Sequence, residues 1–127
     1  MKLLNGEIFG AVEPLMEIAK KELPVKVSWA LAKLSNKLAE SHRAIETVRN
    51  GLIQRYGEKD KENPNNVLIK PESENFPKFV KDAEELFLQE VEIDFEKIKL
   101  PEEVDGKPLT LKPSLLAPLV KFIEIGD

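Results

Sequence analysis

The sequence contains no cysteine, and His42 is the only histidine among its 127 residues. Without cysteine, the chain cannot form a disulfide framework, a thiolate nucleophile or a cysteine-ligated zinc site, and a reducing compartment is compatible with it. A Ser-His-Asp triad or a histidine-based metal site within one chain would have to be built around His42. Because His42 lies within one helical turn of Arg43 and Glu46, we interpret it as a surface histidine beside an ion pair.

Glycine and long apolar runs are also scarce. The six glycines are scattered along the chain, so no glycine-rich phosphate-binding loop is present. The acidic and asparagine-rich segment 58–74 lacks the ligand spacing of a calcium-binding loop. No apolar run approaches membrane-spanning length, and Asn5, Gly6 and Glu7 interrupt the first residues too early for a secretory signal. We therefore expect one domain over residues 1–127 that is soluble, cytoplasmic and not secreted, with no membrane contact, cofactor or metal.

The dominant positive feature is segment 27–56, which lacks proline and has apolar residues at helical spacing. Its seven-residue repeat is typical of helical hairpins and coiled coils. This repeat predicts a helix of about thirty residues that ends at Gly57. Trp29 is interpreted as a core anchor or as a contact with the preceding turn, and ligand stacking is the less common alternative. The predicted core seam consists of Leu31, Leu34, Leu38, Ile45, Val48 and Leu52.

The segments on either side of this helix also show helical spacing. In segment 2–23, Pro14 allows a helix that starts near Glu13 or a longer helix that kinks at the proline. Residues 58–74 are predicted to form a mobile loop, in which residues 67–69 form a short strand or an apolar plug on the core. Residues 76–90 predict a shorter helix that lies antiparallel to the long one.

The last third of the chain has strand patterns. Residues 90–95 alternate strictly between acidic and apolar, with a slip before Ile98 that predicts a bulge or an early strand end. Asp105-Gly106 is a turn signal after which Leu109 and Leu111 are expected to form a strand, and residues 115–120 predict a last short helix. The predicted fold is therefore mainly α with minor β: a long central helix in an antiparallel hairpin or three-helix arrangement, with a small C-terminal β element.

Charge is distributed unevenly along the chain. The net charge is −4, but residues 25–57 carry six basic and two acidic residues, whereas residues 76–127 carry seven basic and twelve acidic residues. We expect the acidic segment to pack beside the basic helix; the alternative is a basic face that binds phosphate. The sequence pI near 5.2 and the lack of interleaved aromatic residues argue against nucleic acid. The candidate basic contact residues are Lys33, Lys37, Arg43, Arg49 and Arg55.

Four stretches of the chain resemble a group of short, uncharacterised proteins encoded by tailed bacteriophages and prophages of Gram-positive bacteria. They are LPVKVSWALAKL at 23–34, LIQRYGEKDKEN at 52–63, FVKDAEELFLQEVEID at 79–94 and PSLLAPLVKFIEI at 113–125. The matching motifs are structural, so no catalytic residue can be carried over. The resemblance implies a role in virion morphogenesis or host takeover, in the host cytoplasm or in the virion, for a small helical protein that docks onto other proteins.

Two function classes follow. The preferred one is a non-enzymatic interaction or assembly factor, for example a tail or head assembly chaperone or a host-takeover adaptor, which holds a protein partner through helix faces and forms homo-oligomers. The alternative is a small regulator that binds nucleic acid, or a nucleic-acid enzyme, through the basic helix. An enzyme ranks last, because no cluster of catalytic residues is visible in the sequence.

Overall fold

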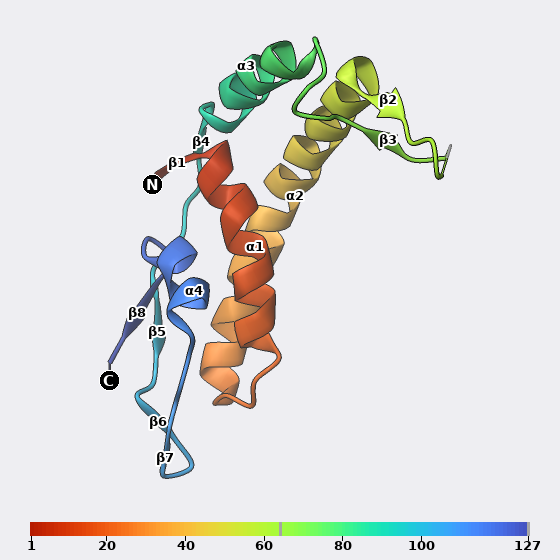
Figure 1. Ribbon diagram of the computed structural model, residues 1–127. Helices are drawn as coiled ribbons and strands as arrows, with labels where there is room; N and C mark the ends of the chain where they lie inside the picture. The colour runs from red at the N-terminus through yellow and green to blue at the C-terminus, as the bar shows by residue number, and fades with distance from the viewer. Residues whose placement is uncertain (64, 127) are drawn as a thin grey trace.

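The computed structural model describes residues 1–63 and 65–126 (Figure 1). Helices dominate the fold, and the strands are two or three residues long, so the predicted mainly α class with minor β is confirmed. The elements in chain order are β1 (Lys2–Leu4), α1 (Asn5–Ala19), α2 (Val25–Tyr56), β2 (Glu58–Lys59), β3 (Val67–Leu68), α3 (Phe76–Phe87), β4 (Glu90–Glu92), β5 (Ile98–Leu100), β6 (Glu103–Val104), β7 (Lys107–Pro108), α4 (Pro113–Leu116), the 3₁₀ turn η1 (Ala117–Leu119) and β8 (Ile123–Ile125).

Helix α1 begins at Asn5 and continues through Pro14, so the longer helix is the alternative that the structure shows, and the start near Glu13 is not. Proline removes the hydrogen bond to the carbonyl four residues earlier, which belongs to Gly10. Gly10 is exposed, and no other atom would lie within 4 Å of a Cβ placed there. The proline therefore lies next to an exposed position of α1 rather than in the middle of its buried stripe.

Helices α1 and α2 form an antiparallel hairpin that builds most of the core (Figure 1). Helix α1 contributes a buried stripe of Ile8, Ala11, Leu15 and Ile18 at helical spacing. Helix α2 has the predicted length and contributes four of the six predicted seam residues as buried side chains. These are Leu31, Leu34, Leu38 and Ile45.

The C-terminal segment covers the other side of this hairpin. Strand β5 pairs in parallel with β8, and β4 pairs antiparallel with β1. The turn η1 packs on α1, and Phe122 behind it is 1% exposed. The Asp105-Gly106 turn is confirmed, since both residues have positive φ (53° and 78°), as a two-residue hairpin of this type requires. Leu109 and Leu111 lie outside the strands as half-buried residues, so the strand predicted for them is wrong.

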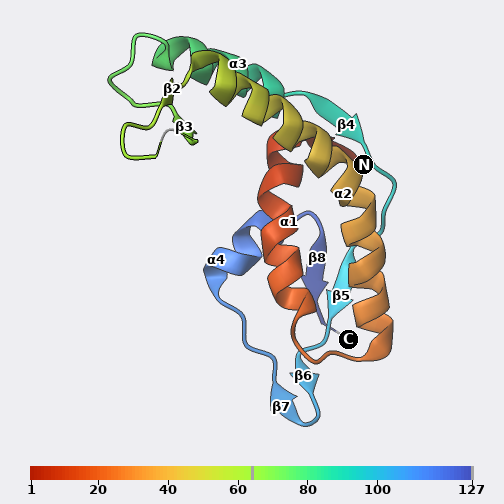
Figure 2. The ribbon, with the colours of Figure 1, turned by 90° about the vertical axis from the view of Figure 1, so that its right-hand side faces the viewer.

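Beyond Ile45, α2 extends past α1 and is accompanied by α3 and by the β2–β3 hairpin (Figure 2). We call the described residues from 46 to 88, which comprise the end of α2, β2, β3, α3 and their connections, the arm, and the rest of the described chain the core region. Helix α3 runs antiparallel to the second half of α2, as predicted. The Tyr56 hydroxyl donates a hydrogen bond of 2.6 Å to the Asp82 carboxylate and so joins the two helices.

The arm buries its apolar residues less completely than the core region. None of the residues of α3, all of which are described, is fully buried. Leu52 is half-buried, and Val48 is 49% exposed. The prediction that Val48 belongs to the core seam is therefore wrong: at this turn of α2, helix α1 contacts Arg49 through Phe9, and the Val48 side chain stays exposed.

Polar contacts attach the arm to the core region, and close packing at Gly57 holds the arm together. Asn5 donates from its backbone N–H to the Gln89 carbonyl and from its side-chain amide to the Leu86 carbonyl, both at 2.9 Å, and so connects the start of α1 to the end of α3. At the other end, Gly57 ends α2 as predicted, in extended backbone. A Cβ at Gly57 would lie 2.6 Å from Val67 Cγ1 and 2.9 Å from the Leu68 carbonyl, so only glycine lets β3 approach this closely.

Candidate interaction surfaces

His42 lies in a packed aromatic contact rather than in a catalytic arrangement. Its ring stacks on Phe9 with 5.0 Å between ring centroids, and its Nδ1 lies 3.6 Å from Glu46 Oε2. Arg43 is exposed and is not the ion-pair partner of this group. Within residues 1–63 and 65–126, no three histidine, aspartate or glutamate side chains come together as metal ligands would.

Arg49 is also held by Phe9. Its guanidinium carbon lies 5.1 Å from the centre of the Phe9 ring, and the centre of the Phe87 ring lies 5.5 Å from the same point. This cluster connects α1, α2 and α3, and it leaves Arg49 half-buried. The contact gives Arg49 a structural role that sequence reasoning missed, because Phe9 lies forty residues away in the chain and no local pattern connects the two.

The five candidate basic residues therefore do not form one face. Lys33 and Lys37 lie in the first half of α2, where they line a groove. Arg43 is exposed, Arg49 packs on Phe9, and Arg55 lies over the ring of Tyr56 at 6.0 Å in the last turn of α2. Only two of the five predicted residues are brought together in the structure.

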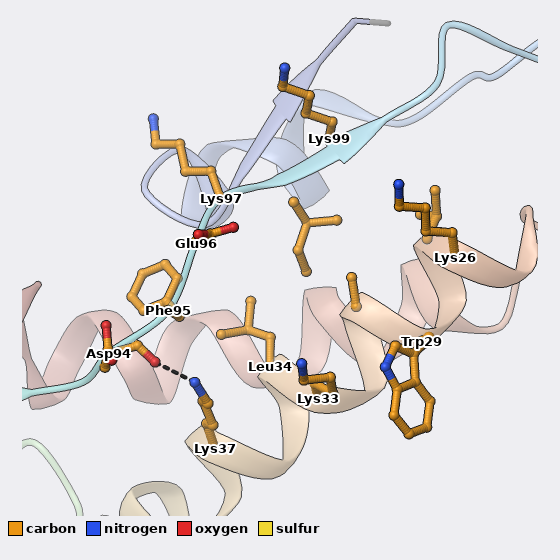
Figure 3. A pocket seen from close by; sticks show the side chains of 13 residues that line it. Lys26, Trp29, Lys33, Leu34, Lys37, Asp94, Phe95, Glu96, Lys97 and Lys99 are labelled. Atoms are coloured by element: carbon orange, nitrogen blue, oxygen red, sulfur yellow. Dashed lines mark hydrogen bonds between the residues drawn. The ribbon is translucent and has the colours of Figure 1, made fainter.

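A groove on the core region contains Lys33 and Lys37 (Figure 3). It has a volume of about 740 Å³ and runs between the first four turns of α2 and the extended segment 94–99. Three lysines lie on α2 and two on the extended segment, where the side chains of Lys97 and Lys99 point away from α2 at the rim of the groove. The lining residues are Lys26, Val27, Trp29, Ala30, Lys33, Leu34, Lys37, Asp94, Phe95, Glu96, Lys97, Ile98 and Lys99.

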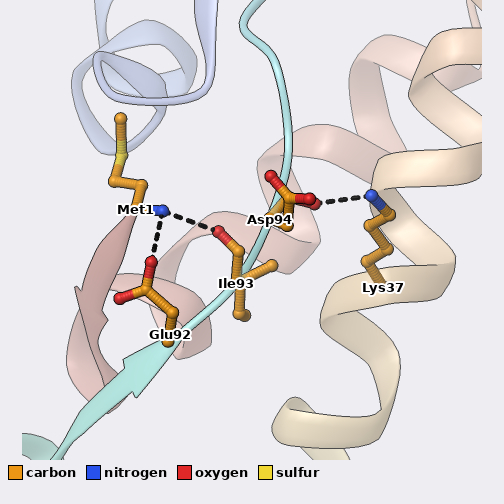
Figure 4. Close-up of polar contacts among 5 residues, drawn as sticks. All are labelled: Met1, Lys37, Glu92, Ile93 and Asp94. Atoms are coloured by element: carbon orange, nitrogen blue, oxygen red, sulfur yellow. Dashed lines mark hydrogen bonds and ion pairs between the residues drawn. The ribbon is translucent and has the colours of Figure 1, made fainter.

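Hydrogen bonds to three consecutive residues hold the second wall of the groove in place (Figure 4). The amino group of Met1 donates to the Glu92 carboxylate at 2.9 Å and to the Ile93 carbonyl at 3.0 Å. On the other side, the Lys37 ammonium donates to the Asp94 carbonyl. The acidic segment thus does lie beside the basic helix, as expected, although the described ion pairs do not join the two.

Trp29 is 67% exposed at the edge of the groove, so its interpretation as a core anchor is wrong. The stripe that α2 buries passes through Val27, Ala30, Leu31 and Leu34, and Trp29 lies on the next strip of the helix. Sequence reasoning also missed Lys97 and Lys99, because they come from a segment some sixty residues further along the chain. The sequence does contain a local signal for their exposure: Lys97 and Lys99 alternate with the apolar Ile98 and Leu100, which are buried, so the lysines lie on the opposite face of the strand.

One carboxyl group in the described chain has a clearly shifted pKa. Glu7, in the first turn of α1, accepts a hydrogen bond of 2.9 Å from the Leu4 backbone N–H and pairs with the Lys121 ammonium. The hydrogen bond from the Leu4 backbone is the larger cause and the contact with Lys121 the second. Together they hold the pKa of Glu7 below its usual value of 4.5. They stabilise the start of α1 and connect it to the C-terminal segment, so their role is structural.

Comparison with protein-family models, with curated proteins and with solved structures finds no match to this chain. Among the helices of the described residues, none combines the length and the apolar character needed to cross a bilayer.

Proposed function

We propose that the protein is a non-enzymatic protein–protein interaction or assembly factor of the kind encoded by tailed bacteriophages, which self-associates through its arm. The observation that carries the proposal is the incompletely covered apolar surface of that arm. The phage-type setting rests on the four stretches of sequence resemblance at 23–34, 52–63, 79–94 and 113–125.

The arm has apolar side chains that its own elements do not cover. Helix α3 has a strongly one-sided apolar pattern, yet all of its apolar residues stay partly accessible. Val48, Leu68 and Leu88 are 49%, 44% and 64% exposed, respectively. Each square ångström of apolar surface removed from water contributes about 25 cal/mol, so covering this surface with another protein is favourable.

A second copy of the chain is the partner that fits this surface best. In a two-fold dimer the same patch serves both subunits, so one apolar face covers itself without the need for a complementary groove elsewhere. The arm also extends away from the core region, which leaves room for a second arm to lie alongside (Figure 2). We therefore expect dimers or higher oligomers, with a further protein partner held by the remaining helix faces.

Sedimentation equilibrium over a range of protein concentrations tests this proposal. The expected result is a mass above that of the 14.4 kDa monomer, which Val48→Glu shifts towards the monomer because it places a charge in the interface. Gln54→Glu is the matched control, since Gln54 is exposed on the same helix and its change adds the same charge. A monomer at every concentration would overturn self-association.

A salt titration separates this function from the alternative of a nucleic-acid regulator. Binding to a DNA duplex that falls steeply as salt rises would favour the regulator, because each neutralised phosphate releases counterions. Self-association through an apolar arm is expected to persist at high salt, since ionic screening acts on charge pairs and not on buried apolar area.

A further inference from the structure

We propose that the groove between α2 and segment 94–99 binds an extended acidic segment of a partner protein. This inference rests on the proposed function as a protein-interaction factor and names the chemistry of one partner. The groove differs from the arm in position and in character, so the two surfaces can be tested separately.

The charge of the groove calls for an acidic ligand. Five lysines line it, against the two carboxylates of Asp94 and Glu96. None of the ion pairs found among the described residues involves these lysines. In a chain whose net charge is −4, a local excess of positive charge is unusual, and it is complementary to carboxylates from outside.

The start of α2 adds to this positive potential. The first turn of a helix carries a partial positive charge, and acidic side chains there are stabilising. Helix α2 has no acidic residue in its first turn and has Lys26 instead, so the local charges repel one another. A carboxylate supplied by a ligand would relieve that repulsion, and Lys26 lines the same groove.

The shape and the lining favour an extended peptide. Between the lysines, the floor is apolar and is formed by Val27, Ala30, Leu34 and Phe95. In the parallel pairing of β5 with β8, the backbone N–H and C=O groups of Ile98 and Leu100 point towards β8. The backbone groups of Lys99 therefore lie on the opposite, open edge of β5. An extended segment with alternating acidic and apolar residues could therefore place carboxylates near the lysines, apolar groups on the floor and its backbone along this edge.

The source of such a segment is a partner protein rather than a second copy. The chain does contain an alternating acidic and apolar run, Glu90–Asp94. Its first three residues are paired with β1 as β4, and Ile93 is buried in the core, so this run is occupied in the fold. Nucleic acid fits less well, because a phosphate backbone has no apolar side chains to place on the floor formed by Val27, Ala30 and Leu34.

Trp29 provides the measurement, since it is the only tryptophan in the chain and lies at the edge of the groove. The probe is an acetylated peptide of alternating glutamate and valine, titrated into the full chain. We expect saturable changes in tryptophan emission with this peptide and none with a peptide in which lysine replaces glutamate. Oligothymidylate is the third probe; stronger binding of this oligonucleotide than of the acidic peptide would overturn the assignment to protein.

Charge reversals locate the binding site. Lys33→Glu combined with Lys99→Glu is expected to weaken peptide binding about a hundredfold. Each reversed charge contributes about tenfold, which corresponds to about 1.4 kcal/mol of binding free energy. Lys78→Glu combined with Lys81→Glu makes the same charge change on exposed residues of α3 and is expected to leave the affinity unchanged. Circular dichroism confirms that each variant is folded. Equal affinities in the two variants would overturn the groove as the site.

The outcome for the groove is independent of the outcome for the arm. If the peptide fails to bind while Val48→Glu still abolishes self-association, the inference fails and the proposed function stands. If the peptide binds but the chain is a monomer at every concentration, self-association fails and the groove remains. Self-association that is lost in the Lys33→Glu and Lys99→Glu variant would instead assign the groove to a second copy, against the inference.

Discussion

The two halves of α2 have similar apolar patterns but very different surroundings. In residues 25–45 the seam residues Leu31, Leu34 and Leu38 are at most 3% exposed, because α1 and the C-terminal segment cover them. In residues 46–56 the same spacing continues through Val48 and Leu52, yet Val48 is 49% exposed. A helical repeat therefore shows which side of a helix is apolar, while burial depends on which other elements reach that side.

This difference divides the stability of the molecule between the two regions. Every residue of the buried cluster lies in the core region, and α3 joins it only through partly buried residues at its C-terminal end, Leu86 and Phe87. Regions with few buried contacts open at a lower free energy than the core. We therefore expect the arm to be the less stable part of the fold, and the three predictions below test this contrast.

The largest effect is expected from removing the same side chain in each half of α2. Leu38 is fully buried, so Leu38→Ala is expected to lower the free energy of unfolding by about 2–5 kcal/mol. Leu52→Ala is expected to cost less than half as much, because Leu52 is only half-buried. Urea unfolding of both variants below the concentration at which the chain associates measures this difference. Equal losses would mean that the arm is as well packed as the core region.

Alanine substitution of two glycines, Gly51 inside α2 and Gly57 at its end, gives the second contrast. Gly57→Ala places a methyl group 2.6 Å from Val67 Cγ1 and 2.9 Å from the Leu68 carbonyl, so we expect a loss of about 1–3 kcal/mol from forced displacement of β3. Gly51→Ala is the control, since no atom would lie within 4 Å of the new methyl group, and it is expected to stabilise the helix by about 0.5–1 kcal/mol.

Hydrogen exchange of the β3 amides separates a local effect from a global one in these two variants. In Gly57→Ala, faster exchange is expected at β3 and unchanged exchange in α1, because the new methyl group meets only the end of α2, at the Ile53 carbonyl, and β3. Uniformly faster exchange throughout the chain would contradict a separate arm.

Local patterns in the sequence predicted the helices and the turn, and they failed where distant segments meet. The length of α2, the stop at Gly57 and the Asp105-Gly106 turn follow from helical spacing and turn residues. For Pro14 and for the slip after residue 95, local patterns left two alternatives open, and the structure shows the longer α1 and an early end of β4.

The candidate surfaces were much less predictable. The groove combines lysines from α2 with Lys97 and Lys99, and their proximity depends on the parallel pairing of β5 with β8. Arg49 was assigned to a basic face because its charge is visible in the sequence, whereas its contact with Phe9 is not. Trp29 was interpreted as a core anchor or as a contact with the preceding turn, and the core interpretation failed because its position on the helix places it at the edge of the groove.

The smallest expected effect concerns Glu7, which stabilises the core region alone. The pKa of Glu7 is lowered in the folded protein, so its charge contributes stability above the unfolded value of 4.5, and this contribution is lost as pH falls through the folded pKa. Glu7→Gln keeps an acceptor for the Leu4 N–H but removes the charge that pairs with Lys121. We expect it to cost about 0.3–1 kcal/mol near pH 7, in the range of charges at helix N-termini.

The pH dependence identifies the cause of that loss. The difference in unfolding free energy between the wild type and Glu7→Gln is expected to shrink as the pH falls below 4.5 and through the lower pKa of the folded state, because Glu7 is then neutral in both states. Glu13→Gln, which changes an exposed glutamate of the same helix, is expected to show a smaller difference at pH 7. If the difference in unfolding free energy between the wild type and Glu7→Gln stayed constant from pH 7 to acid, the Glu7 charge would not stabilise α1. The hydrogen-exchange rates of α3 are expected to be the same in the wild type and in Glu7→Gln, because Glu7 acts within the core region.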